Sequence, residues 1–480
     1  MKVAIVGYGM AGARIARELG RRGAEVTVFG AEPGAAYNRI LLSGMIAGKQ
    51  SEADIALPEP PPHVELRLGT TVDEVDLRAK TVRGTPFDAL VLATGAEAFV
   101  PPLPGLAPPS AAAPSLPPGA HVLRTVEDAR RILAEAERGA AAVVLGGGLL
   151  GLEAARGLAG RGLDVTVVHA SGHLMERQLD PLGSRVLAAT YAELGVKAVT
   201  DATTVRVDRG DHGLTLALAD GRTVTGGLLV VACGVRPRTA LARSMGLDVG
   251  RGVIIDDRCR TSHPDVYAVG DCAEHRGVPY GLVGPAWEQA DVVADLLSGV
   301  DPDAAYTGSR LVTRLKAAGI DLAAMGATDG EEVVSFADPA RGTYARLVID
   351  GEGRLAGAVM LGDNPAVGQV VQLFDTGDPV PHDRRALLMG RPGPAAQTAP
   401  ATPETMPDEV VVCRCNNVTK KELADAFRSG ARTPQALSDA TQASTGCGTC
   451  VDDVAGLCKW LSGTVAGLGE TAPILKEVSI

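Results

Sequence analysis

Cysteine is missing from the first 232 residues of this 480-residue chain, although eight cysteines follow. Cysteines concentrated in this way do not resemble the disulfide framework of a secreted protein. In a reducing compartment, a tight cluster of them indicates metal or redox chemistry. The absence also leaves the first 232 residues without a thiol pair.

Two further absences narrow the function. The chain has 46 Lys and Arg against 57 Asp and Glu, and its net charge of -11 does not favour nucleic acid or an anionic membrane as the partner. No apolar run approaches the length of a membrane span, and the opening MKVAIVGYGMAG enters a glycine turn where a signal peptide would continue its apolar core. We therefore expect a cytoplasmic protein that binds neither nucleic acid nor membrane. The length suggests roughly two to four domains.

Two segments share one pattern of a short apolar strand, a glycine turn and a helix. The turn glycines are Gly7, Gly9 and Gly12 in the first segment and Gly146, Gly148 and Gly151 in the second. Each helix is followed by another strand, EVTVF or DVTVV, and in this context the glycine spacing is typical of dinucleotide binding. The first glycine permits the tight turn, the second lets the backbone approach a pyrophosphate, and the third lets helix and strand pack closely. The phosphates would lie at the helix N-terminus.

The two segments differ at the end of the strand that follows each glycine turn, where a dinucleotide-binding fold contacts the ribose. Glu32 lies 20 residues after Gly12, where a carboxylate can accept hydrogen bonds from the ribose of an adenosine group. The second segment has His169 at this point and no carboxylate, so the usual signal for NADH is missing. His169, with His173 and Arg177, could tolerate a 2'-phosphate, or His169 could be a polar strand end. The residues leave NADH and NADPH open.

The order of the motifs resembles the flavoprotein reductases that carry two dinucleotide-binding domains. The resemblance rests on the two glycine turns, on LVLATGA at 90–96 and on VYAVGDC at 266–272. It implies an α/β fold of two Rossmann-like domains, with the NAD(P)H domain inserted in the FAD domain. It also implies site residues: Glu32, Arg39, Thr94, Gly95, Gly270, Asp271 and the first glycine turn for FAD, the second glycine turn for NAD(P)H, and Glu153 as a catalytic residue beside the nicotinamide. His169, from its place at the strand end, is a further candidate for NAD(P)H binding.

Relatives that reduce disulfides place a reactive thiol after the ribose carboxylate. This chain has AYNRILLSGMIAGK there, with Ser43 and no sulfur. A dithiol reductase is therefore close to excluded, and a hydride delivered to FAD must leave by another route. Four cysteines are scattered between residues 233 and 458 and are interpreted as small buried side chains: Cys233, Cys259, Cys272 and Cys458.

The other four cysteines form a C-x-C and a C-x-x-C pair: Cys413, Cys415, Cys447 and Cys450. Four thiolates suit tetrahedral zinc or an iron-sulfur cluster, and the spacing alone also allows a disulfide. Zinc carries no electrons, whereas the preceding residues are predicted to collect a hydride. The segment from VVCRCNN to STGCGTC resembles the bacterioferritin-associated-ferredoxin-like domain, which implies a [2Fe-2S] cluster on these four thiolates.

A proline-rich stretch without apolar periodicity separates the cysteine motif from the rest of the chain and is predicted to be a linker. With the resemblance, this predicts six segments. They are an FAD-binding domain (1–115 and 238–300), an NAD(P)H-binding domain (116–237), a small α/β domain (301–390), the linker (391–408), a mostly helical [2Fe-2S] domain (409–465) and a tail (466–480).

Nearly the whole chain resembles the N-terminal half of the NAD(P)H nitrite reductase large subunit and the electron-transfer subunit of assimilatory nitrate reductase. The resemblance is carried by TVFGAEPGAAYNRILLSG, GGGLLGLEAA, HLMERQLD, YGLVGPAWEQA and the cysteine motif. It implies electron transfer from NAD(P)H through FAD and the cluster to a separate acceptor, such as a nitrate or nitrite reductase catalytic subunit. Since the sequence carries no cysteine set for a sirohaem module, we expect no nitrite reduction by this chain alone. The alternatives are a rubredoxin or ferredoxin reductase, an opine or amino-acid dehydrogenase subunit, and a zinc-bearing docking module without activity.

Overall fold

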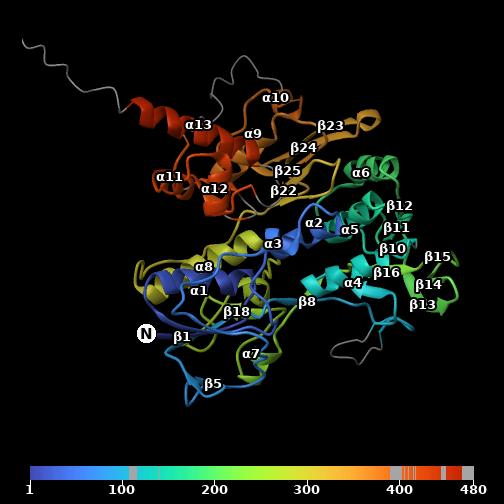
Figure 1. Ribbon diagram of the computed structural model, residues 1–480. Helices are drawn as coiled ribbons and strands as arrows, with labels where there is room; N and C mark the ends of the chain where they lie inside the picture. Colours follow the sequence, from blue (N-terminus) through green and yellow to red (C-terminus); the bar gives the residue numbers. More distant parts are fainter. Residues whose placement is uncertain are drawn as a thin grey trace, which may run out of the picture. The chain divides into compact units, whose positions relative to one another are not determined.

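The computed structural model describes residues 1–107, 116–139, 141–389, 403–404, 406–408, 410–413, 416, 418–444 and 450–467 (Figure 1). The chain divides into two compact units, Met1–Gly393 and Pro394–Ile480. The predicted cluster ligands Cys415 and Cys447 lie outside the described residues, as do most of the predicted linker and tail. Among the described residues, no helix is long and apolar enough to cross a membrane.

A five-stranded parallel sheet begins the first unit, with the strand order β19-β7-β1-β2-β3. Its strands are β1 (Lys2–Val6), β2 (Glu25–Phe29), β3 (Glu65–Arg67), β7 (Ala89–Leu92) and β19 (Val266–Ala268). The inner strand β7 is buried at every residue, as expected for a parallel strand that is covered on both faces. Helices α1 (Met10–Arg21) and α8 (Val283–Ser298) pack side by side over this sheet (Figure 1).

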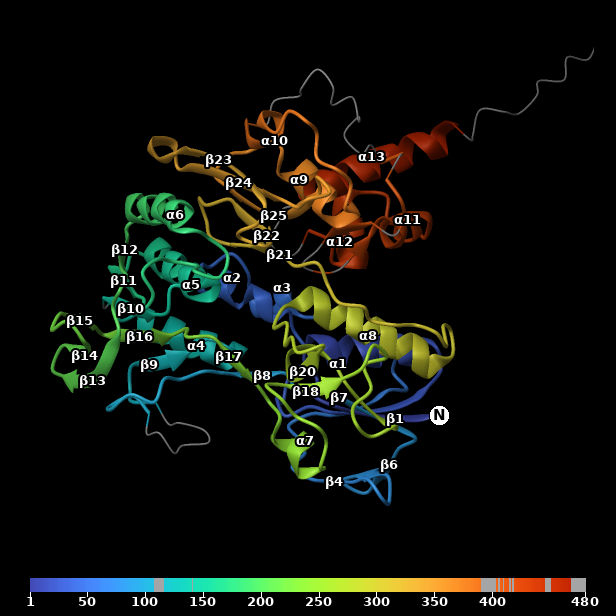
Figure 2. The same ribbon diagram turned by 180° about the vertical axis from the view of Figure 1, so that it is seen from behind.

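Short elements lie between or next to the strands of this first sheet along the chain, and several are seen best from behind (Figure 2). They are a 3-10 turn (Arg39–Leu41), α2 (Leu42–Ile46), α3 (Glu52–Ile55), the three-stranded meander β4 (Val75–Asp76), β5 (Thr81–Val82) and β6 (Thr85–Pro86), α7 (Ala240–Ser244), and the parallel pair β18 (Val253–Ile255) and β20 (Ala273–His275). The first turn of α3 is fixed by a capping box, in which the Ser51 hydroxyl and the Asp54 carboxylate satisfy each other's backbone N–H.

A second parallel sheet of five strands has the order β12-β11-β10-β16-β9. Its strands are β9 (Ala120–Val122), β10 (Ala142–Leu145), β11 (Val165–Val168), β12 (Val196–Val199) and β16 (Leu228–Val231). The helices of this part are α4 (Val126–Ala136), α5 (Leu149–Gly160) and α6 (Pro181–Glu193), and an antiparallel sheet is formed by β13 (Thr204–Gly210), β14 (Gly213–Leu218) and β15 (Thr223–Gly226).

The chain passes between these two sheets through a ribbon of two short strands. It leaves the first sheet after β7 along β8 (Ala96–Ala98) and returns along β17 (Val235–Pro237), and the two strands pair antiparallel. The second sheet is therefore inserted within the first, which confirms the predicted α/β arrangement. The predicted domain boundaries stay a prediction.

The rest of the first unit is an antiparallel sheet with the order β21-β22-β25-β24-β23. Its strands are β21 (Val312–Arg314), β22 (Leu322–Gly326), β23 (Glu332–Asp338), β24 (Thr343–Ile349) and β25 (Leu355–Leu361). Helices α9 (Val367–Thr376) and α10 (Arg385–Met389) pack on it, and Val370 and Phe374 of α9 join its core.

The second unit is mostly helical where the structure describes it. A short antiparallel pair, β26 (Val411–Cys413) and β27 (Val418–Thr419), precedes α11 (Lys420–Arg428), α12 (Pro434–Thr441) and α13 (Val451–Gly467). The hydroxyls of Thr419 and Thr433 cap α11 and α12. Leu423, Leu437 and Leu457 are buried where the three helices meet.

Candidate cofactor sites

The first glycine turn joins β1 to α1. Gly7 has a φ of +112°, and a Cβ added there would stand 2.1 Å from the carbonyl oxygen of Ala93. A Cβ on Gly12 would stand 2.0 Å from the carbonyl oxygen of Gly7, so glycine is required at both positions. Gly9 is the N-cap of α1, and a Cβ there would meet the Nε of Arg39 at 3.8 Å. The space before this N-terminus, which no described side chain caps, fits the phosphates of a dinucleotide.

The second glycine turn, between β10 and α5, repeats this geometry. Gly146 has a φ of +121°, and a Cβ on it would stand 2.3 Å from the carbonyl oxygen of Ala232. A Cβ on Gly151 would stand 2.0 Å from the carbonyl oxygen of Gly146. Gly148 is the N-cap of α5, and a Cβ there would meet none of the described heavy atoms within 4 Å. The chain thus builds two glycine turns of the same form, called here the first and the second cradle, in which the phosphates of the two nucleotides are predicted to lie.

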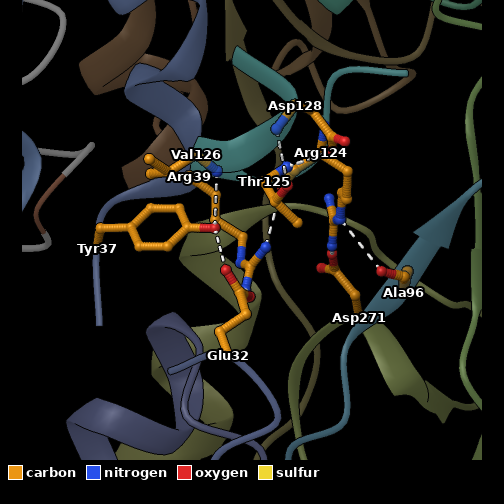
Figure 3. Close-up of polar contacts among 9 residues, drawn as sticks. All are labelled: Glu32, Tyr37, Arg39, Ala96, Arg124, Thr125, Val126, Asp128 and Asp271. Carbon is orange, nitrogen blue, oxygen red and sulfur yellow. Dashed lines mark hydrogen bonds and ion pairs between the residues drawn. The ribbon is translucent and has the colours of Figure 1, made fainter. Parts of the chain in front are cut away.

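Glu32 follows the end of β2, and both of its carboxylate oxygens have partners (Figure 3). The Tyr37 hydroxyl donates to Oε2 at 2.7 Å, and the Arg39 guanidinium pairs with Oε1. Burial raises the pKa of Tyr37, so its hydroxyl stays protonated and can donate. The same hydroxyl accepts the backbone N–H of Val126 at 3.2 Å, and Arg39 donates to the carbonyl of Arg124 at 3.0 Å. These contacts hold the predicted ribose ligand in place.

Asp271 lies in a 3-10 turn (Gly270–Cys272) directly after β19. Its Oδ2 accepts a hydrogen bond from Nη2 of Arg124 at 2.6 Å, and Nε of Arg124 donates to the carbonyl of Ala96 at 3.1 Å (Figure 3). Gly270, which has a φ of +75°, donates its N–H to the side-chain oxygen of Gln289 on α8 at 2.8 Å. The arginine and the glutamine were not predicted, because each comes from a distant segment. The only local signal for Arg124 is its place before the T-x-x-D capping box of α4.

Thr94 and Gly95, also predicted to lie near FAD, stand where the chain leaves β7. The Thr94 hydroxyl donates to the carbonyl of Arg238 at 3.0 Å, and the N–H of Arg238 donates to the carbonyl of Gly95 at 2.9 Å. Cys272 is fully buried, its thiol donates to the carbonyl of Leu92 at 3.4 Å, and burial raises its pKa. A buried thiol with a raised pKa is a poor nucleophile, so Cys272 does not supply the missing redox thiol.

Glu153 is held by two other parts of the chain. Its side chain projects from α5 and is only 4% exposed. The Ser43 hydroxyl of α2 donates to Oε2 at 2.6 Å. The backbone N–H of Lys316 donates to Oε1 at 2.9 Å, and the ammonium group of the same lysine lies 3.1 Å from that oxygen. Ser43, which occupies the position predicted for a thiol in dithiol relatives, is therefore a hydrogen-bond donor to this carboxylate, and Lys316 is a partner that sequence reasoning missed.

His169, predicted to contact NAD(P)H, has both ring nitrogens occupied. The N–H of Gly147 donates to Nδ1 at 3.1 Å, so Nε2 carries the proton and donates to Oε2 of Glu176 at 2.9 Å. His173 donates from Nε2 to the carbonyl of Leu179 at 3.1 Å. The sequence has no carboxylate at this strand end, but the structure brings one there from residue 176.

Two of the four predicted cluster ligands are described, and they lie together. Cys413 ends β26 and Cys450 precedes α13, and both are buried. A contact with the Cys413 thiol and burial both raise the pKa of the Cys450 thiol, and the Ser444 hydroxyl lies 3.5 Å from the Cys450 sulfur. Two adjacent, buried thiols suit a soft metal or an iron-sulfur cluster, which the predicted pair Cys415 and Cys447 would complete.

Three family models match separate parts of the chain. Residues 1–291 match the pyridine nucleotide-disulphide oxidoreductase model, and residues 411–459 match the BFD-like [2Fe-2S] binding domain. Residues 312–374, which include the antiparallel sheet, match the rubredoxin NAD+ reductase C-terminal domain.

Curated relatives match almost the whole chain. A nitrite reductase [NAD(P)H] of Bacillus subtilis (strain 168) is 34% identical over 466 residues, which cover 94% of this chain and 56% of that protein. An assimilatory nitrate reductase electron transfer subunit of the same strain is 33% identical over 477 residues, which cover 96% of this chain and 60% of that protein. The chain thus spans about half to three-fifths of the length of these relatives.

Solved structures share the fold of most of this chain. In the crystal structure of the covalent putidaredoxin reductase-putidaredoxin complex, a chain that is 25% identical superposes with a TM-score of 0.71. The match covers 81% of this chain and 95% of that chain.

Proposed function

The chain belongs to the pyridine nucleotide-disulphide oxidoreductase family, and on that premise we propose that it passes electrons from NAD(P)H to a separate protein acceptor. FAD, NAD(P)H and a [2Fe-2S] cluster are its cofactors, as the two family matches establish. When they are bound, FAD accepts a hydride and the cluster takes electrons one at a time. The observation that carries the proposal is the repeated glycine-turn geometry in a chain whose first unit has Ser43 where dithiol relatives have a thiol.

The residues of the first unit orient the two nucleotides. The N-termini of α1 and α5 receive the pyrophosphates. Their N-cap residues, Gly9 and Gly148, have no side chain, so the backbone N–H groups stay open to the ligand. Glu32 orients the adenosine end of FAD, and Asp271 with Arg124 holds the flavin end. Glu153 presents a buried carboxylate to the nicotinamide and is kept in position by its hydrogen bonds and ion pair. None of these side chains needs to transfer a proton for a hydride to move.

The absorption spectrum of anaerobically purified protein tests this proposal. We expect flavin bands together with the broad absorption of an iron-sulfur cluster, and we expect NADH or NADPH to bleach both. Flavin bands without cluster absorption, or a spectrum that neither nucleotide changes, would contradict the proposal.

We further propose that the acceptor is a nitrate or nitrite reductase catalytic component of nitrogen assimilation, and that the protein works in the cytoplasm. The names of the two Bacillus relatives support this acceptor, and a reducing compartment fits both the use of NAD(P)H and the six described cysteines, none of which forms a disulfide. Replacing Cys413 by Ser is expected to spare reduction of artificial dyes and to abolish reduction of the catalytic partner. Unchanged turnover of the partner would show that electrons do not pass through the cluster.

A second candidate function is reduction of a small iron-sulfur carrier such as rubredoxin. The match of residues 312–374 to the rubredoxin NAD+ reductase C-terminal domain favours it. In that case, the acceptor would take electrons directly from the flavin. The Cys413→Ser protein would then reduce rubredoxin as fast as the unaltered protein does, which separates the two candidates.

A further inference from the structure

We infer that Glu176, oriented by His169, makes the second nucleotide site selective for NADH over NADPH. The inference rests on the proposed function, because it concerns the nucleotide that donates the hydride. The end of β11 has His169 where NADH-binding folds have a carboxylate for the ribose. Glu176 supplies that carboxylate from the loop that follows.

His169 is fixed by the glycine turn beside it. The ring nitrogen Nδ1 accepts the N–H of Gly147, and a Cβ on Gly147 would stand 2.8 Å from the ring carbon Cγ of His169. The ring therefore packs directly against the turn, and the residue is only 8% exposed. An imidazole held in this way has one remaining donor, Nε2–H, whose direction is set by the fold.

The backbone around His169 is equally constrained. Its N–H donates to the carbonyl of Val199 at the end of β12, and its carbonyl accepts the N–H of Ala202, both at 2.9 Å. Asp201 donates its N–H to the carbonyl of Ser171 at 3.0 Å. The loop after β11 is thus bound to the loop after β12, which keeps the strand end in one position.

The Nε2 donor of His169 holds one oxygen of Glu176 at 2.9 Å. This hydrogen bond fixes the Glu176 carboxylate beside the end of β11. The Glu176 side chain is 37% exposed to solvent. At the corresponding point of a dinucleotide fold, a carboxylate accepts hydrogen bonds from the ribose hydroxyls of NADH. A 2'-phosphate at the same place would meet the negative charge of this carboxylate, which its hydrogen bond to His169 holds in position.

The other charged groups of this loop agree with a preference for NADH. Asp201 adds a second carboxylate, since a Cβ on Gly172 would stand 3.3 Å from its Oδ1. His173 donates its Nε2 proton to the carbonyl of Leu179 and is not placed as a free cation. Arg177 is exposed and is the residue of this loop that would serve a 2'-phosphate if the inference were wrong.

Equilibrium binding of NAD⁺ and NADP⁺ to the flavin-loaded protein tests the inference without any dependence on turnover. We expect the unaltered protein to bind NAD⁺ more tightly than NADP⁺. Glu176→Gln removes a charge-assisted hydrogen bond, so the ratio of the two dissociation constants should shift toward NADP⁺ about tenfold. Glu176→Arg should shift it further, and the values of kcat/KM for NADH and NADPH should follow the same order.

Glu193→Gln is the matched control, because Glu193 is an exposed carboxylate at the end of α6 in the same part of the chain. It should leave the ratio unchanged. The inference is overturned if Glu176→Gln leaves the ratio unchanged, or if the unaltered protein prefers NADP⁺ and loses that preference in Arg177→Ala. Failure of the proposed function would look different, because then neither NADH nor NADPH would bleach the flavin of any variant.

Discussion

The glycines of the first turn are expected to have different tasks: Gly7 is needed for the stability of the fold, and Gly9 for the binding of the nucleotide. Gly7→Ala places a Cβ 2.1 Å from a backbone oxygen at a positive φ, so we expect it to lower the free energy of unfolding by about 3 kcal/mol or more. Gly9→Ala meets no such contact and should leave stability nearly unchanged. The added methyl group would occupy the space before α1, so the affinity for FAD should fall about tenfold or more.

Gly368→Ala serves as the control for both substitutions. Gly368 is exposed on α9, and a Cβ there would meet none of the described atoms within 4 Å. It should leave FAD binding unaltered and raise stability slightly, by about 0.5 to 1 kcal/mol. Urea unfolding and the flavin content after dialysis measure the two effects. If Gly9→Ala retains FAD as firmly as the control does, the first cradle is not the site of the phosphates.

Lys316 is expected to matter for stability because its partner is buried. Lys316→Met leaves the carboxylate of Glu153 without a counter-charge, and we expect a loss of about 1 to 3 kcal/mol in the free energy of unfolding. The ion pair of Lys197 and Asp164 has the same distance of 3.1 Å, but its side chains are 69% and 63% exposed. Lys197→Met should therefore cost about 0.5 kcal/mol or less. Equal urea midpoints for the two variants would contradict the role assigned to burial.

The thiol of Cys233 should be inert near neutral pH. Burial raises its pKa to about 11, so about one molecule in a thousand carries the thiolate at pH 8. The thiolate fraction grows as the pH rises toward this pKa, and alkylation by iodoacetamide should accelerate in step. Peptide mass spectrometry of the native and the urea-unfolded protein at pH 8 measures the difference. Rapid labelling of the native protein at this position would reopen the question of a reactive thiol in the first unit.

The residues that could be predicted are those whose function depends on local spacing. Gly7 and Gly146 each stand between a strand and a helix, and Glu32 follows the next strand after Gly7, as the spacing predicted; that they bind nucleotides stays a prediction. Lys316 and Glu176 carry no such local pattern. The first reaches its partner across 163 residues and the second through a loop, so only the folded chain brings them to the sites.

At the level of helices and strands, the C-terminal cysteines are expected to fall into two classes. Cys450 precedes α13 and contacts Cys413, whereas Cys458 lies within the same helix and donates to the carbonyl of Arg432 at 3.5 Å. Cys450→Ser should lose the iron, the acid-labile sulfide and the cluster absorption, while its flavin is still reduced. Cys458→Ser should keep all of them. Loss of iron in both variants would indicate that the helix as a whole, and not the ligand, had been disturbed.

The parallel sheets were easier to predict than the antiparallel one. Buried strands such as β1 and β10 are short apolar runs next to a glycine turn, and their helices follow at once. The order of β21 to β25 depends on pairing between strands that are far apart, for example Leu322 with Leu361. Periodicity says that such strands exist, but not which of them are neighbours.

For the whole molecule, the division into two units predicts separable activities. A chain that ends at Gly393 contains both glycine turns and the antiparallel sheet. We expect it to bind FAD and to reduce ferricyanide with NAD(P)H at a rate similar to that of the full chain. It should fail to reduce the protein acceptor. If the shortened chain did not retain FAD, the first unit would depend on the second, and the two activities could not be separated.

The paired strands β8 and β17 also have a mechanical consequence. They are the two covalent connections of the inserted sheet to the first sheet, and they pair antiparallel with Ala96 opposite Pro237. Both crossings of the chain therefore lie in one ribbon, and the contacts of α2 with α4 and α5 are a second, non-covalent attachment of the inserted part. We expect a substitution that breaks the pairing of β8 with β17 to slow turnover while leaving both cradles intact, because it would loosen the placement of one nucleotide against the other.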